Sequence, residues 1–254
     1  MKLLASDFDG TLAIHNCVPE INYEYIELLR RQGHHFAIVT GRGEMAVIDN
    51  MRPMFDYILA TSGSYIVNNL GNVIYRSLLA KEQLLQMISI ARNSNACSYE
   101  ISNGCFASLT YLVPVDKHPY QSLKKFLKSF SGVESELLDA DLNVQFSIAF
   151  YNEADRDQVL LDLEKIEGIH IHINGLYVDI TNSACSKQTA IEYLNSINQY
   201  DQIFTIGDAL NDYEMVKSNY GFVMEDGHDD LKQIARQTVP SVAECIRRIL
   251  ENLI

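Results

Sequence analysis

The stretch LLASDFDGT, residues 3–11 of 254, decides the fold of this chain. A short apolar run ends there in two carboxylates, Asp7 and Asp9, which one residue separates. Gly10 follows them and lets the backbone turn sharply. Short, continuously apolar runs are typical of strands that helices cover on both faces of a parallel sheet. The stretch therefore predicts a buried strand that carries both carboxylates at its carboxyl end.

The same pattern repeats outward along the chain. A helical stretch at 21–31 precedes a second apolar run at 36–39, and a third run follows at 57–60. Segments 65–67 and 73–75 then flank a turn and predict a hairpin. Near the carboxyl end the pattern resumes, with a helix at 186–197, strands at 203–206 and 221–224, and helices at 229–236 and 242–252.

Residues 81–183 follow a different pattern. They predict helices at 81–91, 120–130 and 154–166, and strands at 97–101, 106–112, 144–151, 169–173 and 177–180. We expect an α/β protein in which residues 1–80 and 184–254 form a doubly wound, mostly parallel, Rossmann-like sheet. An α+β domain of residues 81–183 is inserted into it.

Composition narrows the class of protein. There are 33 acidic and 20 basic side chains, a net charge of −13, and no clustered lysines or arginines to neutralise a nucleic-acid backbone. No run of 18 apolar residues is present, and Asp7 interrupts the apolar start before it could form a signal peptide. The 5 cysteines contain no CxxC pair and predict reduced thiols. We expect a cytoplasmic protein that binds neither nucleic acid nor membrane.

Polar side chains follow the predicted strands where each strand ends. Asp7, Asp9, Thr40, Ser62 and Asp208 all occupy such positions, and they should meet at one edge of the sheet. Clustered carboxylates repel one another unless a cation lies among them. Hard oxygen ligands with room for water and phosphate oxygens favour Mg²⁺.

One basic residue, Lys187, opens the helix after the inserted segment and can balance part of this charge. Carboxylates, Mg²⁺, a lysine and a threonine hydroxyl together suit phosphoryl transfer, where positioning and charge neutralisation supply most of the catalysis.

Four segments in order resemble the signature motifs of the haloacid dehalogenase-like hydrolases: DFDGT at 7–11, TGR at 40–42, Lys187, and GDALND at 207–212. The insertion resembles the type-2 cap of that superfamily, and the nearest subgroup is the Cof-like phosphatases. Any single motif is a weak signal, whereas four in order are a strong one.

The resemblance implies roles for individual residues. Asp7 would be the nucleophile that forms an aspartyl-phosphate, and Asp9 the general acid and then base. Mg²⁺ would be held by the Asp7 carboxylate, the Asp9 backbone carbonyl and Asp208, with Asp212 supporting it through water. The phosphate-binding residues would be Thr40, Gly41, Lys187 and Asn211.

The implied activity is Mg²⁺-dependent hydrolysis of a small phosphorylated metabolite, such as a sugar phosphate or a phosphorylated cofactor, by a monomer or homodimer. A phosphotransferase or phosphomutase would share the aspartyl-phosphate. A non-catalytic phosphate sensor or receiver domain is disfavoured, because Asp9 has no use there and a receiver lacks the insertion. His170 and His172 alternate on a predicted strand and face one side, which also leaves a metal pair open.

Overall fold

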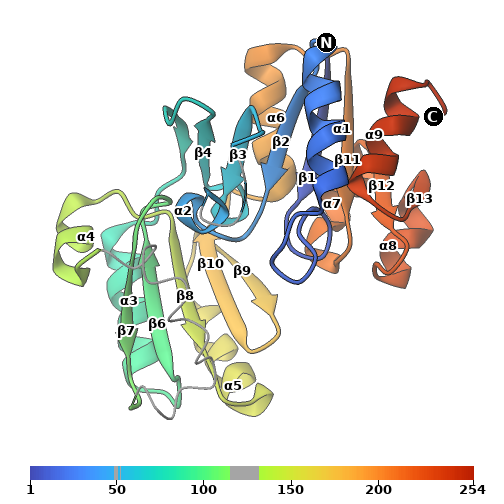
Figure 1. The fold of residues 1–254 in the computed structure, drawn as a ribbon. Helices are drawn as coiled ribbons and strands as arrows, with labels where there is room; N and C mark the ends of the chain where they lie inside the picture. The colour runs from blue at the N-terminus through green and yellow to red at the C-terminus, as the bar shows by residue number, and fades with distance from the viewer. Residues whose placement is uncertain (49–50, 52, 115–131) are drawn as a thin grey trace.

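The computed structural model describes residues 1–48, 51, 53–114 and 132–254, and in this part of the chain the strands form two separate sheets. Figure 1 shows the larger sheet with both chain termini and the smaller sheet beside it. The smaller sheet comes from the middle of the sequence. The described helices include none long and apolar enough to cross a membrane.

The larger, core sheet has eight strands. In spatial order they are β13 (Gln237–Val239), β12 (Tyr220–Met224), β11 (Gln202–Gly207), β1 (Lys2–Asp7), β2 (His35–Val39), β3 (Tyr57–Ala60), β4 (Tyr65–Asn68) and β5 (Val73–Arg76). The first six are parallel, and β4 and β5 add an antiparallel hairpin at the edge. Strand β1 lies in the interior, which explains why residues 3–6 are buried throughout.

Helices cover both faces of the core sheet. On one face, Leu4 of β1 packs in an apolar layer with α1 (Glu20–Arg31), α2 (Glu44–Ile48) and α9 (Val242–Leu250). On the other, Leu3 and Ala5 pack with residues of α6 (Lys187–Asn198), α7 (Tyr213–Ser218) and α8 (Asp229–Ile234). Alternate residues of each strand thus enter opposite layers. This is the doubly wound, mostly parallel core that the sequence predicts.

The smaller sheet, which we call the cap sheet, is antiparallel. Its spatial order is β7 (Ala107–Tyr111), β6 (Ser98–Ser102), β8 (Gln145–Ala149), β10 (Tyr177–Asn182) and β9 (Ile169–Asn174). Its apolar face packs against α3 (Lys81–Arg92) and α5 (Glu153–Leu163), with α4 (Glu134–Ala140) at the edge beside β7. Its other face is polar and lies toward the core.

The α/β class with an inserted α+β unit is confirmed. The sequence missed α4 and the short edge strand β13. The helix predicted at 120–130 lies outside the described residues. The division of the chain at residues 81 and 183 stays a prediction.

Candidate active site

One cavity of about 720 Å³ lies between the carboxyl ends of the core strands and the polar face of the cap sheet. The polar residues at the strand ends meet there, as their positions in the sequence suggest. Seven of the eight predicted site residues line it, namely Asp7, Asp9, Thr40, Gly41, Lys187, Asp208 and Asn211. The eighth, Asp212, is fully buried behind them.

Lys187 joins two of the carboxylates. Its Nζ donates to Asp7 Oδ1 and to Asp212 Oδ1, each at 2.6 Å, and its side chain is 5% exposed. The lysine is the first residue of α6, whose N-cap Ser186 accepts a hydrogen bond from the Thr189 amide at 3.1 Å. A side chain on Gly63 would overlap the Ser186 carbonyl oxygen. The bare glycine therefore allows the end of β3 to approach α6 and hold the lysine in place.

Asp212 shapes the loop after β11 as well as binding the lysine. Its Oδ2 accepts hydrogen bonds from the amides of Asp208 at 3.1 Å and Ala209 at 3.2 Å. Both oxygens are thus bonded within the protein. The contacts make Asp212 an internal brace between Lys187 and the loop that carries Asp208.

Asp208 lies directly beside the DFDGT turn. Thr11 Oγ1 donates to Asp208 Oδ1 at 2.7 Å. Gly10 has a φ of +82°, and a side chain there would overlap the Asp208 carboxylate. The turn after β1 and the loop after β11 therefore fit together only because residue 10 is glycine.

The three carboxylates form a compact acidic group. In the described chain, Asp7, Asp208 and Asp212 each offer an oxygen within 4.8 Å of the others. Burial raises the pKa of Asp7, the charge of Asp212 raises it further, and Lys187 lowers it. Burial likewise raises the pKa of Asp208. The pKa of Lys187 is raised because its two carboxylates outweigh its burial.

This donor set fits a hard divalent cation. One lysine charge faces three carboxylates that all supply oxygen, the ligand atom that Mg²⁺ prefers. The raised pKa values of Asp7 and Asp208 mark a place where added positive charge stabilises the ionised form.

Asp9 lines the cavity with its side chain half exposed. Arg42 binds it with two hydrogen bonds, Nε to Oδ2 at 2.7 Å and Nη2 to Oδ1 at 2.5 Å. Nη2 also donates to Asn16 Oδ1, and the guanidinium lies 5.4 Å from the centre of the Phe8 ring. A bidentate pair of this kind fixes the direction of a carboxylate. The sequence places Arg42 in the TGR motif, but its pair with Asp9 was not predicted.

Thr40 and Gly41 lie at the end of β2. The Thr40 amide donates to the Leu59 carbonyl at 2.9 Å, and Thr40 Oγ1 accepts from the Arg42 amide at 3.1 Å. The Thr40 carbonyl in turn accepts from the amide of Ser62 at 2.9 Å. The ends of β2 and β3 are therefore tied together, and Thr40 is held at the cavity with 1% of its surface exposed.

The cap contributes a polar wall that sequence reasoning missed. Glu100, Ser147, Asp179 and His172, from four different strands, all line the cavity. The sequence does show the pattern that gives rise to this wall, because apolar and polar residues alternate along β6, β8 and β10. Only the sheet pairing shows that the polar positions form one surface.

His170 and His172 do face one side, as their spacing suggests. Their ring centres are 4.2 Å apart, and one nitrogen of each ring has a partner: His170 Nδ1 bonds the Cys185 carbonyl at 3.2 Å, and His172 Nε2 bonds Thr181 Oγ1 at 3.2 Å. Among the described residues, no third potential ligand joins the two histidines in a candidate metal group. The histidines therefore belong to the cavity wall.

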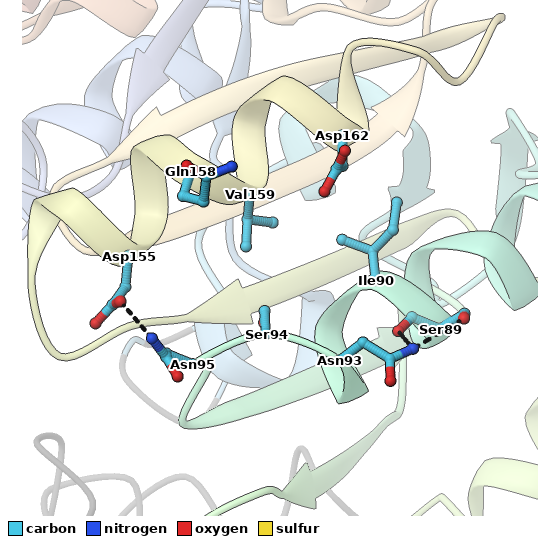
Figure 2. Close-up of a pocket in the computed structure, with 9 residues that line it drawn as sticks. All are labelled: Ser89, Ile90, Asn93, Ser94, Asn95, Asp155, Gln158, Val159 and Asp162. Atoms are coloured by element: carbon cyan, nitrogen blue, oxygen red, sulfur yellow. Dashed lines mark hydrogen bonds between the residues drawn. The ribbon is translucent and has the colours of Figure 1, made fainter.

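A second hollow lies on the opposite side of the cap, between α3 and α5 (Figure 2). Its polar groups bond to one another: Asn95 Nδ2 donates to Asp155 Oδ1 at 2.7 Å, and Asn93 Nδ2 to the Ser89 carbonyl at 2.9 Å. None of the strand-end residues reaches it. This hollow is therefore separate from the candidate active site.

Comparison with known proteins identifies the family. The family model described as haloacid dehalogenase-like hydrolase matches residues 4–245. The chain belongs to this family. Among curated proteins, "Putative phosphatase YkrA" of Bacillus subtilis (strain 168) is 22% identical over 248 residues, which cover 92% of this chain and 90% of YkrA. The resemblance inferred from the four motifs is thus confirmed, and the chain is a haloacid dehalogenase-like hydrolase.

Solved structures share the whole architecture, cap included. A haloacid dehalogenase-like hydrolase from Bacteroides thetaiotaomicron superposes with a TM-score of 0.82 at 21% identity, covering 98% of this chain and 99% of the other. A haloacid dehalogenase subclass IIB sugar phosphatase gives 0.78 at 21% identity, with both chains fully covered. At these identities the likeness establishes the fold, and the roles of single residues rest on the geometry described above.

Proposed function

We propose that this hydrolase is a Mg²⁺-dependent phosphatase that acts on a small phosphorylated metabolite through an aspartyl-phosphate on Asp7. The arrangement around Asp7 carries the proposal. Its carboxylate is 8% exposed at the cavity, bound to Lys187 and close to Asp208. A buried carboxylate oriented by a fixed cation is what an attacking nucleophile requires.

In the first half-reaction, a carboxylate oxygen of Asp7 attacks phosphorus. The bond from phosphorus to the ester oxygen breaks, and protonated Asp9 gives its proton to the departing oxygen. Asp9 suits this task because it lies at the rim, where its side chain is 50% exposed and can reach a leaving group. Thr40, the Gly41 amide and Lys187 would hold the oxygens of the phosphoryl group, and Asn211 would reach it from the loop after β11.

In the second half-reaction, water attacks phosphorus of the aspartyl-phosphate. Asp9, now ionised, takes the proton from that water, and the bond from phosphorus to Asp7 breaks. The products are inorganic phosphate, the free Asp7 carboxylate and a protonated Asp9 ready for another cycle. Arg42 would keep Asp9 aimed at the cavity through both halves.

Mg²⁺ would be held by the carboxylates of Asp7 and Asp208 and by the Asp9 carbonyl, with Asp212 as an outer support. When bound, it supplies positive charge that offsets the negative charge of the phosphoryl oxygens. The hydrogen bonds of Asp212 to two amides and Lys187 agree with a supporting position, because its oxygens already have partners.

The test is release of inorganic phosphate from p-nitrophenyl phosphate, with Mg²⁺ or with EDTA. We expect activity with Mg²⁺ and its loss in EDTA, and Asp7→Asn should reduce activity by about a thousandfold or more. Asp226→Asn, which changes an exposed carboxylate elsewhere in the core, serves as the matched control. Transfer of the phosphoryl group to a sugar without phosphate release would show a phosphotransferase instead.

A further inference from the structure

The polar wall of the cap is built as a row of paired residues. Glu100 on β6 pairs with Ser147 on β8, Ser147 pairs with Asp179 on β10, and Asp179 pairs with His172 on β9. Paired residues on adjacent strands point to the same face of a sheet, and adjacent strands lie about 4.8 Å apart. The row therefore crosses the cap sheet in a single line, and all four residues line the cavity.

The two carboxyl groups of this row keep bonding capacity for a ligand. Asp179 Oδ1 accepts a hydrogen bond from Ser147 Oγ at 2.6 Å, which leaves Oδ2 available in the described structure. The Glu100 side chain forms no hydrogen bond with a described residue, and only burial and the charge of Asp179 act on its carboxyl group. A carboxyl group held in a partly buried cavity without donors is costly unless something supplies them.

Charge divides the cavity into two unlike halves. Within the described lining, lysine and arginine come only from the core, as Lys187 and Arg42, where the phosphate is expected. The cap half has two carboxyl groups and histidines. Burial lowers the pKa of His172 to about 4, so this ring is neutral at pH 7.

The surroundings of the row raise the pKa of both of its carboxyl groups. Burial raises the pKa of Glu100 to about 8, and the charge of Asp179 adds to the shift. Burial raises the pKa of Asp179 to about 6, against the hydrogen bond from Ser147. At neutral pH the pair thus retains negative charge, and a second anion beside it would be repelled.

Building on the phosphatase function proposed above, we infer that the cap wall selects the leaving group of the substrate. Glu100 and Asp179 accept hydrogen bonds from hydroxyl or ammonium groups of the leaving group, and they exclude leaving groups with a second negative charge. The substrate class is therefore a phosphate monoester of a polyol or an amino-polyol, with its single anionic group facing Asp7 and Lys187.

The core and cap walls together set the orientation of the bound substrate. A phosphate bound at the strand ends places the rest of the molecule toward the cap, because both walls line one cavity. An ester of a hydroxylated chain can then donate to the row, whereas a carboxylate or second phosphate would have to lie beside two carboxyl groups. Discrimination of this kind uses repulsion as well as attraction.

The experiment compares two open-chain esters, sorbitol 6-phosphate and 6-phosphogluconate, which differ in a terminal CH₂OH or carboxylate. We expect kcat/KM with Mg²⁺ to be at least about tenfold higher for the sorbitol ester, because like charges are excluded. A second pair, glucose 6-phosphate and glucosamine 6-phosphate, tells hydroxyl from ammonium. Either order within that pair supports the proposal if both exceed 6-phosphogluconate.

The variants Glu100→Gln and Asp179→Asn test which residues discriminate. At pH 9, where both carboxyl groups are ionised, each should lower the ratio of kcat/KM for sorbitol 6-phosphate to that for 6-phosphogluconate by about five- to tenfold, since each removes one repelling charge. Asp162→Asn is the matched control, an exposed carboxylate on α5 at the second hollow (Figure 2). It should leave the ratio unchanged, and thermal unfolding checks that every variant is folded.

A wild-type enzyme that treats the two esters equally, or variants that keep the full ratio, would overturn the proposal. Failure of the phosphatase function itself looks different, since p-nitrophenyl phosphate would then also be inert. In that case calorimetry with Mg²⁺ present tests the proposal by measuring the dissociation constants of the two esters. Equal values contradict the role of Glu100 and Asp179, and tighter binding of the sorbitol ester supports it.

Discussion

The two walls of the cavity are built in opposite ways. In the core wall, Lys187 and Asp212 are at most 5% exposed, and their polar atoms bond to one another and to backbone amides. In the cap wall, the Glu100 side chain forms no hydrogen bond with a described residue, and the Asp179 side chain accepts one from Ser147. Lys187 and Asp212 are thus bonded within the protein. The cap wall retains donors and acceptors for something outside the chain.

This difference separates two tasks. Groups that perform chemistry must be held in fixed geometry, which the ends of parallel strands provide by converging at one edge. Groups that choose a substrate need free hydrogen-bonding capacity, which the solvent-facing side of an antiparallel sheet provides. Changes in the core wall should therefore leave the preference for sorbitol 6-phosphate over 6-phosphogluconate unchanged, whereas changes in the cap wall should alter that preference.

The largest effect should come from Asp9→Asn. With sorbitol 6-phosphate as substrate, we expect kcat to fall by about 10²- to 10⁴-fold, because the leaving alkoxide then lacks a proton donor. With p-nitrophenyl phosphate the fall should be smaller, since nitrophenolate leaves without a proton. Steady-state kinetics on both substrates measures the difference, with Asp226→Asn as control. Equal losses on the two esters would show that Asp9 is not the acid.

Removing the positive charge of Lys187 from the core wall should lower the stability of the fold. In Lys187→Met, Asp7 and Asp212 lose their shared partner while they remain buried. We expect the free energy of unfolding to fall by about 3–5 kcal/mol, the typical result of breaking a buried ion pair from one side. Urea unfolding in EDTA measures it.

Lys165→Met is the matched control for that measurement, because Lys165 is 73% exposed and its ion pair with Asp162 lies on the surface. Its effect should stay below about 1 kcal/mol, as for other surface pairs. A loss as small as this in Lys187→Met would mean that the core wall is not held together by the lysine.

A smaller effect is expected at the rim. Arg42→Lys keeps the charge but cannot bind Asp9 through two parallel hydrogen bonds. We expect kcat to fall by about tenfold for sorbitol 6-phosphate and 6-phosphogluconate alike, because one bond of the pair is lost. Arg247→Lys changes a second bidentate pair, with Glu244 on α9, and should leave kinetics as they are. A change in substrate preference in Arg42→Lys would contradict the division between the walls.

The cap wall should also show a pH dependence of stability. The pKa of Glu100 rises from 4.5 to about 8 on folding, because burial disfavours the ionised form. The protonated Glu100 therefore makes its full contribution to folding stability below pH 4.5, and this contribution is lost as the pH rises toward 8. Glu100→Gln should exceed wild type in Tm by more at pH 9 than at pH 5. Glu167→Gln, an exposed cap residue, should show a constant difference, and a constant difference in Glu100→Gln would contradict the shift.

Much of the core could be predicted because its functional residues lie in short local motifs. DFDGT, TGR and GDALND each join a buried strand to a turn, so residue order alone assigns their polar side chains to one sheet edge. The pair of Arg42 with Asp9 could not be predicted, since it depends on how two turns approach one another. The cap row was equally hidden, because Glu100, Ser147 and Asp179 are far apart in the chain.

The sequence by itself determined the alternation of strands and helices, the family resemblance, and the carboxylates and lysine of the core wall. These follow from periodicity and local turn chemistry, which act over a few residues. Tertiary structure alone decided that Lys187 lies between Asp7 and Asp212, that Asp9 is bound by Arg42, and which polar cap residues form one wall. Those contacts depend on strand register and on the packing of the cap against the core, which residue order leaves open.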